Sequence, residues 1–330
     1  MGNSRRDKLQ GIAISLPTFN DDDFNLELDK SRLHIQWLMD QGLEEGNCVF
    51  FIAGGLGEGY FLDDYEWEAM ANTLAESTKG EVPTGIGVFE LSARRAARKA
   101  KYAADLGIDF IQCAAPHYMQ PTEDEIFLHF QYISDRADVG IMAYNIPWAM
   151  PGGYEYSRRL IERFTTINNF VGLKWKSSSW QHYLNMIRLF GNELNFISNG
   201  NVMSLGYKYG AKGFTDFTVN VAPRLSLHRL QLIREKRFEE YDEQEIATRM
   251  DPPLHNVGPE EMSPSGMGEG PSARLTLSTL GLYTGPHFPA QAPFPQSHID
   301  AHIRSVDASG IRDWIDWNQS IFNGVDQGKA

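Results

Sequence analysis

Short, almost continuously apolar runs alternate with amphipathic segments along residues 11–241 of the chain. The runs predict strands buried on both faces, as in a parallel sheet; they cover residues 11–16, 48–53, 82–89, 110–115, 139–146, 171–176, 195–198 and 213–219. Each run precedes a segment with the apolar spacing of a helix, at residues 30–43, 63–79, 92–106, 122–135, 156–164, 180–190, 202–209 and 225–241. Eight strand–helix units is the number that closes a (β/α)8 barrel.

We therefore predict a (β/α)8 TIM barrel over residues 1–241 and a C-terminal helical extension over residues 242–330. The alternative is an open, doubly wound sheet, but no dinucleotide-binding glycine motif follows the first strand. In the extension, residues 250–272 are dense in Pro, Gly and Ser, which predicts a long loop. Helices are predicted at residues 273–282, 297–303 and 308–322. We expect this small extension to pack on the barrel or on a neighbouring subunit.

Composition narrows the class of partner. The formal charge of -13 argues against nucleic acid or an anionic membrane, because both attract clustered Lys and Arg. Cys48 and Cys113 are the only cysteines, so the chain has no disulfide framework and no metal-ligand spacing, which is typical of a reducing compartment. We find neither a secretion signal nor a long apolar span, and we expect a cytoplasmic protein.

One lysine lies inside a predicted strand. Lys174 is in the apolar run 170–176, where burial of a cation is unfavourable, so its amine is expected to become neutral and nucleophilic. Such an amine is a candidate for Schiff-base formation with a carbonyl substrate. The alternative is a lysine at a strand end whose amine reaches water. Strand alternation places Lys176 on the same face, where it would lower the pKa of Lys174 or bind an anion, and turns Trp175 toward the helices.

Other candidate residues lie where strands of such a barrel end, which is where barrel active sites are built. The loop after the second strand contains Gly54, Gly55 and Leu56, whose backbone N–H groups would bind an anion such as a carboxylate. The fourth strand leads into residues 116–121, and the fifth ends in the sequence Tyr-Asn-Ile-Pro at 144–147.

These motifs carry a resemblance to a known family. The segments are GGLGE at 54–58, PHYMQP at 116–121, YNIP at 144–147, GLK at 172–174 and GFTDFTVNVAP at 213–223. In this order and spacing, the chain resembles the dihydrodipicolinate synthase and N-acetylneuraminate lyase superfamily of class I aldolases. The resemblance extends over residues 11–240 and resumes near residue 273.

The resemblance implies a mechanism and a set of roles. Lys174 would form a Schiff base with a pyruvate-like 2-oxo acid, and Tyr144 would be the proton shuttle. The backbone at Gly55 and Leu56 would hold the carboxylate of the 2-oxo acid. Tyr118 resembles the tyrosine that reaches into the adjacent subunit's site, which implies a homodimer or homotetramer. The mechanism requires no metal and no cofactor.

Two departures from the family pattern bear on the substrate. The family usually has two threonines in the second loop, whose hydroxyls bind the carboxylate and relay protons, and here Gly55 and Leu56 replace them. Dihydrodipicolinate synthases also have an arginine two residues after the Tyr-Asn-x-Pro motif that binds the aldehyde substrate, whereas this chain has Ala149. A true dihydrodipicolinate synthase is therefore not expected.

The residues expected around the outer pocket suggest a second substrate, for which an aldehyde is a candidate. Trp148, Met150 and Met119 would favour apolar or aromatic bulk, unless they only pack against one another. Asn199 and Thr215, which follow the seventh strand and lie in the eighth, would bind hydroxyl groups of a sugar acid instead. Nearby, Asn201 would add a polar group, and Asp216 is a functional carboxylate or the partner of a cation.

Three functions remain open at this stage. The first is a Schiff-base lyase, or aldolase, acting next to a pyruvate unit. The second is a dehydratase or hydratase-aldolase of a 2-oxo sugar acid or an aryl-substituted 2-oxo acid, since the second loop resembles the ketodeoxyglucarate dehydratase branch while residues 144–147 resemble the sialic acid lyase branch. The third is a non-catalytic sensor of a 2-oxo acid, which the missing threonines would favour.

Overall fold

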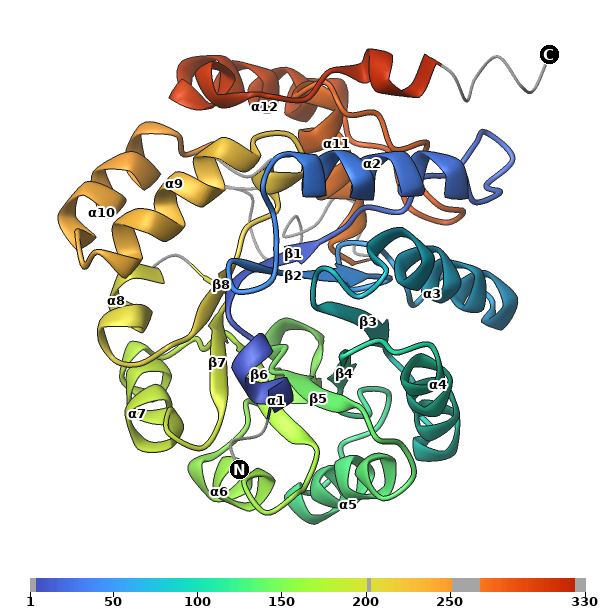
Figure 1. Ribbon diagram of the computed structural model, residues 1–330, viewed down its shortest axis with the longest axis vertical. Coiled ribbons are helices and arrows are strands. Elements are labelled where there is room, and N and C mark those ends of the chain that lie inside the picture. The colour runs from blue at the N-terminus through green and yellow to red at the C-terminus, as the bar shows by residue number, and fades with distance from the viewer. Residues whose placement is uncertain (1–3, 201–202, 251–267, 324–330) are drawn as a thin grey trace.

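The computed structural model describes residues 4–200, 203–250 and 268–323 of the chain. Parallel strands form a closed barrel in the order of the sequence, and Figure 1 shows the helices around its outside. The strands are β1 (Gly11–Ser15), β2 (Cys48–Ile52), β3 (Thr84–Val88), β4 (Phe110–Ala114), β5 (Gly140–Tyr144), β6 (Phe170–Trp175), β7 (Asn195–Ser198) and β8 (Gly213–Thr215). The last strand pairs with the first, which confirms the predicted (β/α)8 barrel.

Helices follow the strands as predicted, and local caps define where several of them begin. They are α2 (Leu28–Asp40), α3 (Asp64–Thr78), α4 (Ala93–Asp105), α5 (Glu123–Ser134), α6 (Arg158–Phe164), α7 (Trp180–Phe190), α8 (Met203–Lys208) and α9 (Pro223–Arg234). Hydroxyl groups accept a hydrogen bond from the first turn of α4, α5, α6 and α7, at Ser92, Thr122, Ser157 and Ser179. These caps satisfy backbone N–H groups that lack a partner inside the helix.

The interior of the barrel is apolar below its carboxyl-terminal mouth. One apolar cluster fills it: Leu9, Ala13, Val49, Phe51, Phe110, Met142, Val171 and Ile197. The short helix α1 (Ser4–Lys8) lies across the amino-terminal end in Figure 1, where the side-chain amide of Asn195 binds its backbone. The apolar filling gives way to polar groups at Tyr144 and Lys174, near the carboxyl ends of β5 and β6, so a site forms at that mouth.

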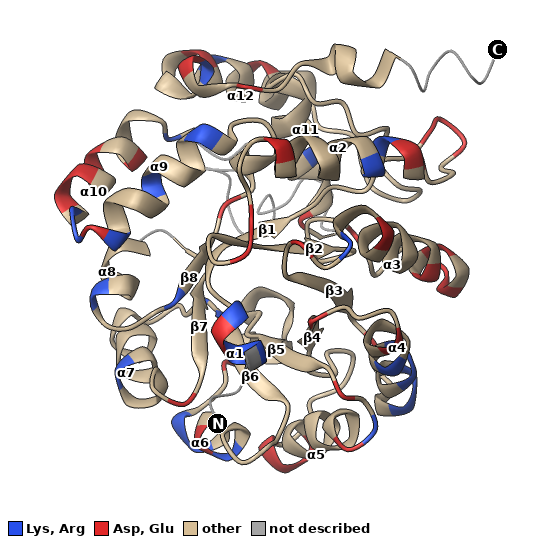
Figure 2. Cartoon of the chain, in the orientation of Figure 1, with Lys and Arg blue, Asp and Glu red and all other residues tan. Residues whose placement is uncertain are grey.

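Most charged side chains lie on the outer helices. Figure 2 shows acidic residues on α3 and basic residues on α4, both on the outside of the barrel. No helix within the described ranges is long and apolar enough to cross a membrane. Charged groups at the mouth of the barrel are exceptions to this placement on the outer helices.

The single helix predicted over residues 225–241 is wrong. Two helices replace it, α9 and α10 (Phe238–Ala247), because the chain turns sharply between them. Lys236, in this turn, adopts a left-handed backbone conformation with a φ of 61°. A helical period continues across so short a turn, so periodicity alone did not reveal the break.

The C-terminal extension contains α11 (Gly270–Thr279) and α12 (Gln296–Ala308), which lie next to each other above α2 in Figure 1. Helix α11 begins inside the predicted loop over residues 250–272. Most of that loop lies outside the described residues, but its last residues form the start of this helix. The extension therefore brings part of the predicted loop to the mouth of the barrel.

The helix predicted over residues 308–322 is also wrong. The segment forms two short 3-10 turns, Gly310–Trp314 and Gln319–Phe322. Between them, the backbone N–H of Trp317 donates to the carbonyl oxygen of Val221 at 3.0 Å. Contacts with the barrel thus replace the hydrogen bonds of a continuous helix.

A buried ion pair joins the extension to the glycine-rich loop. In α11, Arg274 donates through Nε to Glu58 Oε2 at 2.8 Å, and the two side chains are 6% and 1% exposed. The other carboxylate oxygen of Glu58 accepts a hydrogen bond from Gln291 at 2.6 Å. Because both charges are removed from water and each is held by the other, the pair fixes the start of α11 relative to the barrel.

We expect Arg274→Met to lower the free energy of unfolding by about 3–5 kcal/mol, since it leaves the buried Glu58 carboxylate without its cation. Urea unfolding followed by tryptophan fluorescence would show a lower midpoint. The matched control is Arg32→Met, which removes a largely exposed pair with Asp29 and should change the midpoint little. Equal effects of the two substitutions would contradict this assignment.

Candidate active site

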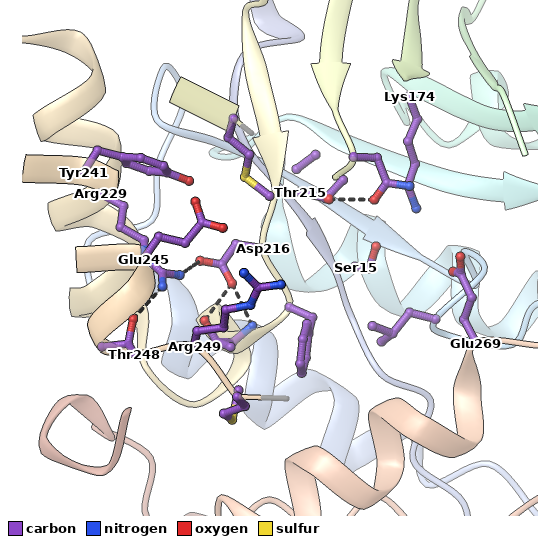
Figure 3. Close-up of a pocket in the computed structure, with 17 residues that line it drawn as sticks. Ser15, Lys174, Thr215, Asp216, Arg229, Tyr241, Glu245, Thr248, Arg249 and Glu269 are labelled. Atoms are coloured by element: carbon purple, nitrogen blue, oxygen red, sulfur yellow. Dashed lines mark hydrogen bonds and ion pairs between the residues drawn. The ribbon is translucent and has the colours of Figure 1, made fainter. Parts of the chain in front are cut away.

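Lys174 and Tyr144 lie side by side at the mouth of the barrel. They are paired residues on the neighbouring strands β6 and β5, so strand alternation turns both side chains to the interior. The Lys174 amine is 4.1 Å from the centre of the Tyr144 ring, and the two side chains are nearly fully buried. Lys174 faces a cavity of about 360 Å³, shown in Figure 3, which is large enough for a small organic acid.

Burial holds the pKa of Lys174 below its usual value. Removal of the amine from water is the largest cause, the Glu269 carboxylate opposes it, and the nearby Lys176 cation lowers the pKa further. The neutral amine is the nucleophilic form. The alternative of an amine that reaches water is wrong, because Lys174 is only 4% exposed. Trp175 faces the helices as predicted and donates to the carbonyl oxygen of Tyr183 at 3.2 Å.

The Tyr144 hydroxyl is the centre of a hydrogen-bond chain. It donates to Glu269 Oε1 at 2.8 Å and accepts from the Asn199 amide at 3.1 Å. The Thr215 hydroxyl in turn donates to the side-chain oxygen Oδ1 of Asn199 at 2.8 Å. Burial, followed by the Glu269 charge, raises the pKa of Tyr144 well above its usual value, so the phenol keeps its proton. These hydrogen bonds orient the phenolic proton toward the Glu269 carboxylate.

Glu269 is a site residue that the sequence did not reveal. It immediately precedes α11 and projects its carboxylate into the cavity that contains Lys174 (Figure 3). A Cβ atom placed on Gly55 would lie 2.6 Å from Glu269 Oε2, so the carboxylate takes the space directly beside that glycine. A single glutamate in a loop rich in Pro, Gly and Ser has no distinguishing pattern, and its position depends on the packing of the extension.

The glycine-rich loop lies beside Glu269, at the carboxyl end of β2. Leu56 lines the larger cavity, and Gly54 lies 3.6 Å, measured from a Cβ placed on it, from the Gln112 amide nitrogen. Among the described residues, none accepts a hydrogen bond from the backbone N–H of Gly55 or Leu56. These two donors are therefore available to bind an anion that enters the cavity.

A second, apolar cavity of about 270 Å³ adjoins Tyr144. Its lining is Gly55, Tyr60, Phe61, Phe89, Ala114, His117, Tyr144, Ile146, Trp148, Ala149, Met150 and Gly268. Trp148 and Met150 thus lie together at this cavity, as the sequence suggested. Met119 does not line it, and its side chain is about half exposed. The prediction that Met119 contributes to the outer pocket is therefore wrong for its own subunit.

The remaining predicted residues separate into those near the site and those away from it. Asn199 and Thr215 line the larger cavity. Asp216 is the partner of a cation, because its carboxylate binds Arg229 at 3.1 Å and accepts from Ser226. Tyr118 is 83% exposed and lines neither of these two cavities. Asn201 lies outside the described residues.

The fold and the site together define a class of protein. A (β/α)8 barrel with a buried amine of lowered pKa beside a phenol has the groups needed for covalent chemistry on a carbonyl compound. The described residues contain no group of His, Cys, Asp and Glu that could hold a metal ion.

Comparison with known proteins identifies the family. A sequence model of the dihydrodipicolinate synthetase family matches residues 8–262, and the chain belongs to this family, whose members are lyases and aldolases. The chain is 29% identical over 189 residues to the 4-hydroxy-tetrahydrodipicolinate synthase of Bradyrhizobium diazoefficiens, a match that covers 57% of this chain and 63% of that relative. It is 25% identical over 236 residues to the enzyme of that name from Porphyromonas gingivalis, covering 71% and 78%.

A solved structure agrees in fold. The chloride-inhibited dihydrodipicolinate synthase from Acinetobacter baumannii, complexed with pyruvate, superimposes with a TM-score of 0.75 at 19% identity and covers 92% of this chain and 99% of its own. This likeness of fold extends over nearly the whole chain and confirms the barrel. At this level of identity it leaves the substrate to be argued from the site.

Proposed function

We propose that this chain is a Schiff-base-forming lyase of a pyruvate-type 2-oxo acid, with Lys174 as the nucleophile and Tyr144 as the proton carrier. One observation carries the proposal: a buried amine with a lowered pKa lies 4.1 Å from the ring of a buried tyrosine and faces a cavity. The family and a fold shared with a synthase complexed with pyruvate are consistent with it.

The proposed reaction begins with attack of the Lys174 amine on the C2 carbonyl carbon. Tyr144 passes a proton to the hydroxyl group of the carbinolamine and regains one from solvent, so the hydroxyl group leaves as water and an iminium ion remains on Lys174. The iminium draws electrons from C3, so that either the C3–C4 bond or a C3–H bond breaks. The N–H groups of Gly55 and Leu56, which have no acceptor among the residues that the structure describes, support a place for the substrate carboxylate beside the amine.

The apolar cavity argues against a dihydrodipicolinate synthase. Ala149, at the position where those enzymes have an arginine, lines this cavity together with Trp148 and Phe89. The lining of this cavity contains no lysine or arginine to bind the carboxylate of a second substrate. The difference from the relatives named as synthases therefore concerns the second substrate, and not the lysine chemistry.

The alternative is a dehydratase or hydratase-aldolase, which would use the same iminium ion and lose or add water. An aryl-substituted 2-oxo acid fits the aromatic lining of the smaller cavity. A sugar acid is less favoured, because Thr215 and Asn199, the polar groups expected to bind its hydroxyls, are already bonded to each other and to Tyr144. The third candidate, a non-catalytic sensor, would bind the acid without turnover.

Two further expectations stay predictions. A homodimer or homotetramer is supported by the exposed side chains of Tyr118 and Met119, which follow β4 and would be buried in a subunit interface. A cytoplasmic location rests on the sequence alone.

Borohydride trapping tests the proposal. Incubation with pyruvate followed by reduction should add the mass of a reduced pyruvyl group, and peptide mapping should place it on Lys174. Product analysis with sugar-derived and aryl-substituted 2-oxo acids then separates the candidates: release of pyruvate identifies a lyase, and water loss without carbon–carbon cleavage identifies a dehydratase. A protein that forms no adduct with pyruvate would contradict the Schiff-base proposal.

Trp148→Ala should weaken use of an aryl-substituted 2-oxo acid. We expect its KM to rise about 3–10-fold, since an aromatic contact contributes about 0.5–1.5 kcal/mol. Formation of the pyruvate adduct should change much less, because pyruvate has no aryl group to contact Trp148. Trp180→Ala, which removes a similarly exposed tryptophan on α7, is the control. An unchanged KM in Trp148→Ala would count against an aryl group in this cavity.

A further inference from the structure

Glu269 reaches the reacting groups from outside the barrel. It lies in the C-terminal extension, 125 residues from Tyr144 in sequence. Its carboxylate nevertheless accepts a hydrogen bond from the Tyr144 hydroxyl at 2.8 Å. It also lines the cavity with Lys174, and its charge acts on the pKa of both residues. The mouth of the barrel therefore contains three groups able to exchange protons, and the strands provide only two of them.

Glu269 lies where the second loop lacks the threonine hydroxyl of the family pattern. Gly55 stands where the family pattern has a threonine, and a Cβ atom there would come within 2.6 Å of Glu269 Oε2. A threonine at residue 55 and this position of Glu269 exclude each other. The Glu269 carboxylate thus lies on the side of Tyr144 where the threonine hydroxyl of the family pattern would be.

The extension holds Glu269 in this place by buried contacts. The backbone N–H groups of Glu269 and Gly270 lie close enough to the Tyr60 hydroxyl to act on its pKa. Gly268 has a φ of 97°, and a Cβ atom there would clash with the Tyr60 hydroxyl. Farther along α11, Arg274 forms its buried ion pair with the second loop. Such support is what a proton-transfer group needs, because its distance to the partner has to be kept.

We propose that Glu269 is the proton acceptor of Tyr144 and replaces the missing hydroxyl relay. The inference rests on the proposed Schiff base. When a C3–H bond of the iminium ion breaks, its electron pair forms the C2–C3 double bond of the enamine and the iminium nitrogen becomes neutral. The proton passes to the Tyr144 oxygen while the phenolic proton passes to Glu269 Oε1. In carbon–carbon cleavage, the proton of the C4 hydroxyl follows the same route and the C3–C4 electron pair forms the enamine.

Pyruvate alone is a sufficient probe, because enamine formation exchanges its methyl protons with solvent. In D2O, proton NMR should show loss of the methyl signal with wild-type protein. We expect Glu269→Gln to slow this exchange about 10²-fold or more, the usual contribution of a general base. The limb of the wild-type pH–rate profile that reports the carboxylate should disappear, whereas a merely structural role would leave the profile unchanged. Glu269→Asp should restore part of the rate and the limb.

Borohydride trapping separates failure of this inference from failure of the proposed function. Glu269→Gln should still form the pyruvate adduct on Lys174, which shows that the barrel is folded. The matched control is Glu123→Gln, which removes a glutamate that also accepts a tyrosine hydroxyl, from Tyr154, but lies outside both cavities. Its exchange rate should equal that of the wild type.

Two results would overturn the inference. An unchanged exchange rate and pH profile in Glu269→Gln would show that Tyr144 does not need this acceptor. A faster exchange would identify Glu269 as a plug that competes with the substrate carboxylate at Gly55 and Leu56. If the wild-type protein forms no adduct, the proposed function itself is wrong.

Discussion

Lys174→Ala should abolish the borohydride-trapped pyruvate adduct completely, the largest effect we expect from any single substitution. No other described amine combines burial with a place in the cavity: Lys174 is 4% exposed, whereas Lys176 points to solvent. An amine with a lowered pKa is unprotonated in a larger fraction of molecules at neutral pH, and only this form attacks a carbonyl group. Mass spectrometry of the reduced protein measures the result directly.

Lys176→Ala is the matched control for this experiment. It removes the exposed lysine directly after the end of β6 but leaves the proposed nucleophile, so the adduct should persist. Because the Lys176 cation lowers the pKa of Lys174, its removal should shift the pH dependence of adduct formation upward. An adduct that survives in Lys174→Ala, or disappears in Lys176→Ala, would transfer the nucleophilic role to the other lysine.

Tyr144→Phe should reduce pyruvate methyl exchange about 10²–10⁴-fold, the range for loss of a general acid–base group. The phenyl ring keeps the packing against the Lys174 amine, whereas the hydroxyl that binds Glu269 and Asn199 is lost. The adduct should therefore form, but more slowly, because water leaves the carbinolamine without a positioned proton donor. Time-resolved trapping and proton NMR measure the two rates.

Tyr154→Phe controls for the loss of a tyrosine–glutamate hydrogen bond as such. Its hydroxyl donates to Glu123 at 3.1 Å, away from the cavities, so both rates should stay at the wild-type level. If Tyr144→Phe exchanges protons as fast as the wild type, a different group must carry the proton. Glu269 would then be the first candidate, because it lines the same cavity.

The sequence by itself determined the barrel and its central pair. Eight buried strands have a pattern that depends only on neighbouring residues, and parallel strands place their carboxyl ends together. The alternation of side chains along β5 and β6 then turned Tyr144 and Lys174 to the same interior, and the structure bears out this geometry. Breaks such as the turn at Lys236 escaped because a helical period continues across them.

Only the tertiary structure decided what else enters the mouth of the barrel. Glu269 gave no local signal, since it lies in a stretch without a period, and its place is set by contacts with residues far away in sequence, among them Tyr60 and the ion pair of Arg274 with Glu58. The apolar cavity likewise combines loops after different strands. Patterns along a chain report the faces of single elements, whereas the third proton-transfer group and the shape of the second pocket arise where separate elements meet.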